Sequence, residues 1–235
     1  MKNPADNEIF TLDIPPQLDI KAVAKRVTTG KTSPRYHQML EELAAATLAA
    51  AHPVGLYKVS HILKNDGKKV DIDGVTFTST VLSKLFEGQE TVIPFIVTGG
   101  KELMEMVSAR GDMMKQFYLD TIKTLIVANA VNYLKEYVQK KHLMPKVALM
   151  NPGEIEDWYI VEQHPLFSLF GDVEKRIGVT LTKGGVMHPI KSRSGIIFAN
   201  DAGFETCHLC TQKTCPGRRV KFDPEMYKHY LGKTV

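Results

Sequence analysis

Residues 178–199 read GVTLTKGGVMHPIKSRSGIIFA, and this stretch decides the fold class. Residues 178–182, 186–190 and 194–199 carry the Val, Ile and Thr content that is typical of strands. The pair Gly184-Gly185 stands between the first two runs and predicts a tight turn that joins antiparallel neighbours. We therefore expect three short strands here, following one another directly.

Upstream of this stretch the pattern alternates between blocks of helix and blocks of strand. Ser33-Pro34 predicts a helix start, with apolar residues at helical spacing up to Ala51. Strand composition follows at residues 54–62, at residues 70–78 with an interruption at Gly74, and at residues 91–98, with a short helix at residues 81–86.

A long helical region is predicted over residues 101–141, broken near Gly111. Its second part carries apolar residues on more than one face, which predicts a buried central helix. Asn151-Pro152-Gly153 predicts a turn, and a short helix over residues 167–177 is predicted to end at Gly178. Blocks of strands and helices, without strict alternation, favour an α+β fold with a largely antiparallel sheet.

Composition describes an ordinary globular chain of 235 residues, with 43% hydrophobic and 24% charged residues and a net charge of +4. There is no repeat or low-complexity linker, so one core is expected. No run approaches the roughly 18 apolar residues of a membrane span, and no apolar leader occurs in residues 1–16. We therefore expect a cytoplasmic protein with no membrane partner. The mild charge disfavours a nucleic-acid-binding zinc module, so no nucleic acid partner is expected.

All three cysteines of the chain fall within nine residues: Cys207, Cys210 and Cys215. Thiolates at these separations can converge on one metal or iron–sulfur cluster. Zinc would need a fourth ligand, either His208, which is awkwardly placed between two cysteines, or a distant histidine. A [4Fe–4S] cluster tolerates three cysteine ligands, and a proline such as Pro216 directly after the last ligand is common in ferredoxins. An iron–sulfur cluster is therefore favoured over zinc. Three unrelated thiols, or a disulfide with a spare thiol, are the alternatives.

The cysteine loop follows the last predicted strand, so we expect it to be an appendage at a sheet edge. This divides the chain into an α+β domain over residues 1–200 and a cysteine-rich iron–sulfur or zinc segment over residues 201–235. The basic residues Arg218 and Arg219 follow the loop at once. They are candidates for docking an acidic partner protein.

Several segments resemble the reactivation domain of cobalamin-dependent methionine synthase. They are Asn151-Pro152-Gly153, LFGDVEK at 169–175, IGVTLT at 177–182 and MHPIKSRSG at 187–195. More specifically, the chain resembles stand-alone relatives of that domain in anaerobes, which end in a cysteine-rich Cys-Pro-Gly-Arg-Arg segment. It implies one twisted antiparallel sheet flanked by helices, and S-adenosylmethionine and corrinoid contacts at Asn151, Pro152, Gly153, His188, Pro189, Ser194 and Gly195.

The methyl-donor loop departs from the family pattern at two positions. The family loop reads Arg-Pro-Ala-Pro-Gly-Tyr, and residues 149–154 read LMNPGE. Leu149 thus replaces the arginine and Glu154 the aromatic residue. Loss of a charge-assisted contact costs about 1.5–3 kcal/mol, so weak or absent S-adenosylmethionine binding is predicted.

The resemblance implies a protein that helps reduce or remethylate inactive cob(II)alamin on a corrinoid protein or corrinoid methyltransferase. The cysteine-bound iron–sulfur cluster would supply electrons, with a low-potential electron donor as a further partner. Whether such a protein is itself an enzyme is left open by the sequence. The alternative is a non-enzymatic accessory subunit of a corrinoid methyltransferase in which the metal is structural.

Overall fold

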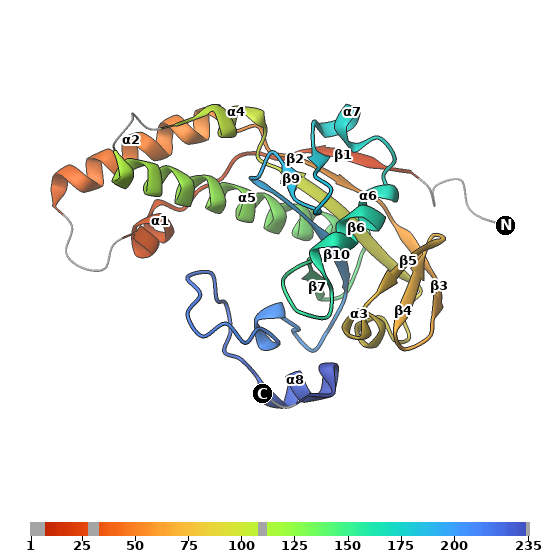
Figure 1. The fold of residues 1–235 in the computed structure, drawn as a ribbon. Helices are drawn as coiled ribbons and strands as arrows, with labels where there is room; N and C mark the ends of the chain where they lie inside the picture. The colour runs from red at the N-terminus through yellow and green to blue at the C-terminus, as the bar shows by residue number, and fades with distance from the viewer. Residues whose placement is uncertain (1–7, 28–32, 108–111, 234–235) are drawn as a thin grey trace.

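The computed structural model describes residues 8–27, 33–107 and 112–233 (Figure 1). Within these ranges the chain forms one eight-stranded sheet, a separate two-stranded hairpin and flanking helices. The strands of the large sheet are β1 (Phe10–Asp13), β2 (Val54–Tyr57), β3 (Ser60–Asn65), β4 (Lys69–Ile72), β5 (Val75–Thr78), β6 (Thr91–Thr98), β7 (Val147–Met150) and β10 (Ser192–Ala199). The hairpin consists of β8 (Thr180–Leu181) and β9 (Met187–His188).

The two longest strands, β6 and β10, run antiparallel at the centre of the large sheet. On one side β10 pairs with β7, and on the other side of β6 the strands β2 and β3 follow one another along the same edge. From there β2 pairs with β1, while β3 leads into β4 and β5. Every pairing is antiparallel, and the branching of strands from β6 curls the sheet (Figure 1).

The helices fall into two groups. An arm extends from the sheet and consists of α1 (Ile20–Val27), α2 (Pro34–Ala50), α4 (Lys101–Glu105) and the long α5 (Met113–Lys141) (Figure 1). The others are α3 (Thr80–Leu85), α6 (Gln163–Ser168), α7 (Val173–Ile177) and α8 (Pro224–Leu231), with short 3₁₀ turns η2 (Ile160–Glu162) and η3 (Thr206–His208).

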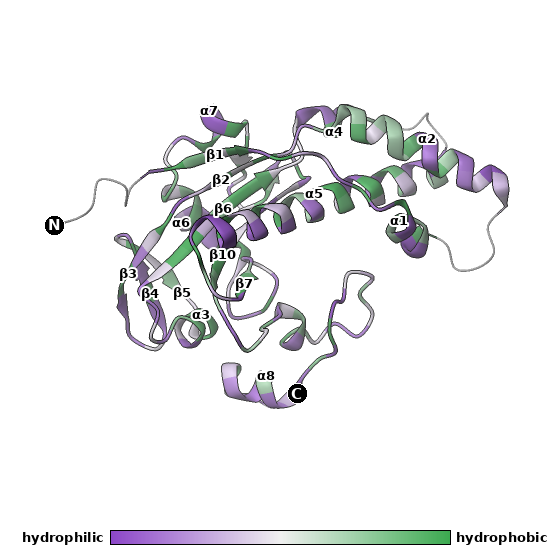
Figure 2. Ribbon diagram, turned by 180° about the vertical axis from the view of Figure 1, so that it is seen from behind, coloured by the Kyte–Doolittle hydropathy of each residue, from purple (hydrophilic) through white to green (hydrophobic). Residues whose placement is uncertain are grey.

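Alternation along the strands divides the core between the two faces of the sheet. Ile197 of β10 packs with the second half of α5, whereas Ile196 and Phe198 belong to a larger cluster on the opposite face. That larger cluster also contains Leu209 and Tyr227, so the C-terminal segment packs onto the main core. In Figure 2 the ribbon of β6 is largely apolar in colour, and α5 alternates between apolar and polar residues.

The α+β class and the largely antiparallel, curled sheet flanked by helices are confirmed. The predicted buried helix is α5, with eleven buried residues, among them Ile122, Leu134 and Val138. The predicted helix end at Gly178 is confirmed by its left-handed φ of 69°. Gly111, where a break was predicted, lies outside the described residues.

Three expectations were wrong in detail. Residues 54–62 form two strands, β2 and β3, whereas the predicted interruption at Gly74 is confirmed as the turn of the β4–β5 hairpin. Residues 167–177 contain parts of two short helices, α6 and α7. The cysteine segment does not follow an edge strand, because β10 is paired on both sides.

In the part of the chain that the structure describes, no helix is both long and apolar enough to cross a membrane.

Candidate functional site

One candidate site is a cleft of about 440 Å³ between α5, β10 and the C-terminal segment. Its walls come from parts of the chain that are far apart in sequence. Among the lining residues are one leucine and six charged residues: Leu149, Arg26, Lys135, Lys191, Arg193, Glu205 and Arg219. We call this feature the α5–β10 cleft.

Strand alternation explains why charged side chains at the start of β10 line the cleft. Ser192 and Ser194 are buried, and Ser194 Oγ donates to Gln163 Oε1 at 2.9 Å. Lys191 and Arg193 occupy the intervening positions and therefore lie on the α5 side of the sheet. Lys191 Nζ is held there by Asp120 Oδ1 at 2.8 Å and Thr124 Oγ1 at 2.9 Å.

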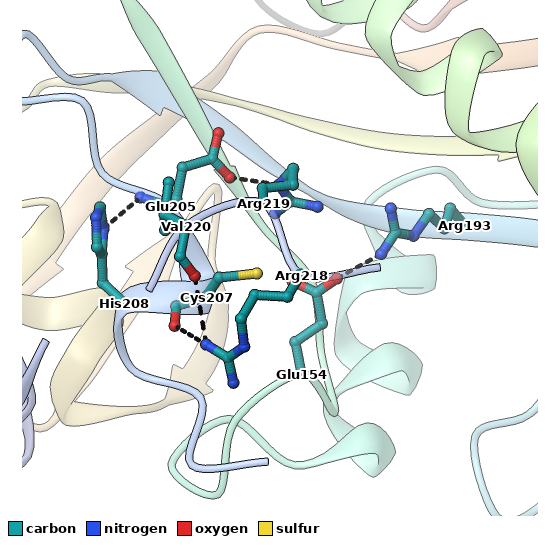
Figure 3. Close-up of polar contacts among 8 residues, drawn as sticks. All are labelled: Glu154, Arg193, Glu205, Cys207, His208, Arg218, Arg219 and Val220. Carbon is teal, nitrogen blue, oxygen red and sulfur yellow. Dashed lines mark hydrogen bonds and ion pairs between the residues drawn. The ribbon is translucent and has the colours of Figure 1, made fainter. Parts of the chain in front are cut away.

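Two arginine–carboxylate pairs involve residues that line the cleft, and both are drawn in Figure 3. Arg193 Nη2 lies 2.5 Å from Glu154 Oε1, and Arg219 Nε lies 2.6 Å from Glu205 Oε2. Burial alone would lower the pKa of Arg219, but the hydrogen bond and charge of Glu205 raise it. The charges of Cys207 and Glu154 add to this effect, so both lie within electrostatic reach of Arg219.

The cysteine loop is organised around the guanidinium of Arg218 (Figure 3). Its nitrogens donate to the backbone carbonyls of Cys207 at 3.1 Å, Cys210 at 3.1 Å and Val220 at 3.4 Å, and also to that of Gln212. Arg218 is thus engaged within its own loop, while Arg219 lies at the cleft. Partner docking by either arginine remains a prediction.

The three thiols are free; Cys207 and Cys210 are half-buried and Cys215 is exposed. Within residues 8–27, 33–107 and 112–233, no three His, Cys, Asp or Glu side chains come together as a possible metal site. His208 stabilises the start of the η3 turn, because its Nδ1 accepts a hydrogen bond from the backbone N–H of Glu205 at 3.3 Å. In this conformation the cysteine loop therefore does not fit a metal cluster.

Several residues predicted to bind a cofactor do come together where β7 meets β10. An ideal Cβ on Gly195 would lie 2.4 Å from the carbonyl oxygen of Met150 and 3.0 Å from Asn151 Oδ1. Gly195 therefore allows a backbone approach that no other residue permits. Asn151 and Pro152 are buried, and Gly153 adopts a φ of +84° in the turn.

The segment with His188 and Pro189 lies apart from that junction. His188 pairs with Thr180 in the β8–β9 hairpin, and its exposed side chain makes no hydrogen bond or ion pair with the described residues. The His188–Pro189 peptide bond is cis, and the carbonyl of Pro189 accepts from Ser192 Oγ at 2.7 Å. His188 is thus available at the surface.

Of the charged residues of the cleft, Arg219 was identified from the sequence as a docking candidate, whereas the others were not. Lys191 and Arg193 lie within the segment 187–195, and period-2 alternation alone would have placed them on one face of a strand. Lys135 carried no such signal, because a single lysine on a long helix is ordinary. The pairing of Arg193 with Glu154 crosses 39 positions of the chain and needed the structure.

No family model and no curated protein matches the sequence. Among solved structures, a crystal structure described as the MetH reactivation domain bound to AdoHcy matches with a TM-score of 0.62. The match covers 84% of this chain and 80% of that chain, at 16% sequence identity. The chain therefore has the fold of the MetH reactivation domain, the fold that its sequence segments led us to expect.

Proposed function

We propose that this chain is a reactivation-type protein of a corrinoid methyltransferase system. It would dock on a corrinoid protein in the inactive cob(II)alamin state and promote reduction or remethylation of the cobalt. The observation that carries the proposal is the shared fold with the MetH reactivation domain over most of both chains. The sequence segments that resemble that domain fall after β7, at α7, in the β8–β9 hairpin and at the start of β10.

An exposed apolar surface beside the hairpin supports docking on a corrinoid. An ideal Cβ on Gly185 would meet the backbone of Ile160 at 2.6 Å, so the hairpin turn lies against the segment around η2. The side chains of Tyr159, Val161 and Val186 are 65%, 51% and 43% exposed there. Clustered exposed apolar side chains mark interaction surfaces, and a corrin ring offers a broad, partly apolar face.

We further propose that an S-adenosyl ligand occupies the α5–β10 cleft and binds weakly. The similar structure is described as bound to AdoHcy. Here Leu149 lines the cleft without a hydrogen-bond donor, and Glu154 is already paired with Arg193. Calorimetry with S-adenosylmethionine should therefore show weak binding, and a low-micromolar dissociation constant would contradict this proposal.

An iron–sulfur cluster on Cys207, Cys210 and Cys215 remains part of the proposal, with zinc as its alternative. The spacing of the cysteines supports it, and their partial exposure leaves the thiols accessible. Because the thiols do not converge in the present conformation, the loop would have to rearrange around the metal. Serine substitution at each cysteine should strongly reduce the iron or zinc content of anaerobically purified protein. Full metal retention in any two of the variants would show that these cysteines do not form the metal site.

The corrinoid role is tested by mixing the protein with a cob(II)alamin-loaded corrinoid protein and a strong reductant. The cobalt absorption spectrum should change on mixing, and cob(I)alamin or methylcobalamin should form faster than without this chain. His188→Ala should weaken the effect because His188 is exposed beside the proposed docking face. His37→Ala, at an exposed position on α2, is the matched control.

Two outcomes redirect the proposal. If neither spectrum nor rate responds with corrinoid proteins from the same organism, the reactivation role fails. If the complex forms but the rate does not change, the chain is a non-enzymatic accessory subunit. Cysteine variants that dock but lose rate would separate an electron-transfer role from a structural one.

A further inference from the structure

The α5–β10 cleft gathers positive charge from four separate parts of the chain. Its cationic lining residues are Arg26 of α1, Lys135 of α5, Lys191 and Arg193 at the start of β10, and Arg219 of the C-terminal segment. The acidic lining residue in the described part of the chain is Glu205. Cations that converge on one concavity from distant segments create a local positive potential.

Neighbouring carboxylates neutralise only part of this charge. Asp120 pairs with Lys191, Glu154 with Arg193 and Glu205 with Arg219. Five cations against three carboxylates leave an excess of two positive charges.

The two remaining cations are Arg26 and Lys135. Their side chains make no ion pair or hydrogen bond with the described residues. Lys135 is half-buried, so part of its side chain packs against the protein beside the cleft. An anion in the cleft would therefore pair with Lys135 without displacing a carboxylate of the described residues.

The rest of the lining mixes apolar and neutral polar residues. The side chains of Leu125, Val127, Val131, Leu149 and Ile190 contribute to the same walls. A volume of about 440 Å³ lies within the size range of small-molecule sites. The cleft thus combines an apolar wall with an excess of cations, which suits an amphipathic anion.

We propose that the α5–β10 cleft binds a small ligand that carries an oxyanion, a phosphate or a carboxylate, on an apolar body. Lys135 and Arg193 hold the oxyanion. Arg193 uses one nitrogen for Glu154, and its guanidinium retains further N–H donors for a ligand. The inference rests on the charges and walls of this cleft and stands without the corrinoid role.

Charge also sets the selectivity of the cleft. S-adenosylhomocysteine has a carboxylate and an ammonium group and no net charge, whereas S-adenosylmethionine adds a sulfonium cation to the same skeleton. An excess of positive charge disfavours the sulfonium. S-adenosylhomocysteine should therefore bind more tightly than S-adenosylmethionine, and the difference should shrink as salt is added.

Isothermal titration calorimetry on the full chain, with no corrinoid present, tests the proposal. The probes are adenosine 5′-monophosphate for phosphate, S-adenosylhomocysteine for carboxylate, and adenosine as the uncharged reference. At least one of the two anion-bearing probes should bind about tenfold more tightly than adenosine at low salt. The probe that does so identifies the preferred oxyanion. Equal binding of all three probes, or none, overturns the proposal.

Two variants locate the site. Lys135→Gln should weaken the preferred probe about fivefold to tenfold, whereas Lys64→Gln, which removes the same charge at an exposed position on β3, should leave it unchanged. The double variant Arg193→Gln/Glu154→Gln keeps the net charge and should also weaken binding. If Lys135→Gln behaves like Lys64→Gln, the cleft is not the binding site.

Discussion

The guanidinium of Arg193 and the carboxylate of Glu154 join β10 to the turn that follows β7, with Nη2 and Oε1 2.5 Å apart. The second carboxylate oxygen, Oε2, is buried and has no hydrogen bond among the described residues. Glu154 therefore depends on Arg193 for its charge compensation. The turn that the resemblance assigns to a methyl donor is thus tied down by a side chain of the neighbouring strand.

Arg193→Ala should lower the free energy of unfolding by about 1–3 kcal/mol, because it leaves a largely buried carboxylate without its partner. The double variant Arg193→Ala/Glu154→Ala should regain part of this loss. Urea denaturation of wild type, both single variants and the double variant gives the coupling free energy. Strictly additive effects would show that the two side chains do not stabilise each other.

Gly195→Ala should be strongly destabilising, by about 3 kcal/mol, because its methyl group would overlap the carbonyl oxygen of Met150 in the adjacent strand. Gly184→Ala is the control, since the nearest atom to an ideal Cβ there is Thr182 Oγ1 at 4.0 Å. Thermal denaturation of both variants checks this. Equal melting temperatures would mean that β7 and β10 can separate at no cost.

Acid should weaken the fold through Asp73, which pairs with Lys58 at 2.9 Å with both side chains largely buried. Burial raises the pKa of Asp73, but the backbone N–H of His61 and the side chain of Lys58 outweigh it, and the pKa is lowered overall. The stabilisation is present above the ordinary carboxyl pKa of about 3.9 and is lost as the pH falls through the lowered value.

Asp73→Asn should therefore cost about 3 kcal/mol at neutral pH and flatten the acid dependence of stability between about pH 5 and pH 2. Asparagine tolerates the left-handed φ of 52° at this position, so the backbone is preserved. Urea denaturation across that pH range measures the slope. Asp201→Asn, at an exposed position, should leave the slope as in wild type.

Arg218→Lys should loosen the cysteine loop although the charge is kept, because one ammonium cannot reach the four carbonyls that the planar guanidinium serves. The half-buried thiols of Cys207 and Cys210 should then react faster with a thiol reagent. Lys213→Gln, at an exposed position in the same loop, is the control. Unchanged thiol reactivity in Arg218→Lys would mean that the loop is held by other contacts.

Local patterns predicted what local forces determine. Gly178 ends α7 with a left-handed φ, and α5 is buried on several faces as its apolar residues indicated. The break between β2 and β3 escaped prediction because it arises from the partner strand. Lys58, at the break, donates to the carbonyl of Pro94 in β6, and Pro94 has no N–H to donate in return.

The candidate site was predictable only in part, for the same reason. The turn at Asn151 and the glycine at position 195 were identified, and they do meet. The cleft itself forms where α1, α5, β10 and the C-terminal segment converge, and convergence is a property of tertiary packing. Cysteine spacing likewise indicated a metal loop, whereas the backbone at Cys207 and Cys210 is positioned by the guanidinium of Arg218, a contact that spacing alone does not predict.

Arg218 also bears on any attempt to move the cysteine segment into another protein. A graft of residues 207–215 alone would carry the thiols but leave behind the side chain that gathers the carbonyls of Cys207, Cys210 and Gln212. The smallest portable unit therefore extends at least to Val220, whose carbonyl is the fourth acceptor. In this sense one arginine sets the boundary of the module.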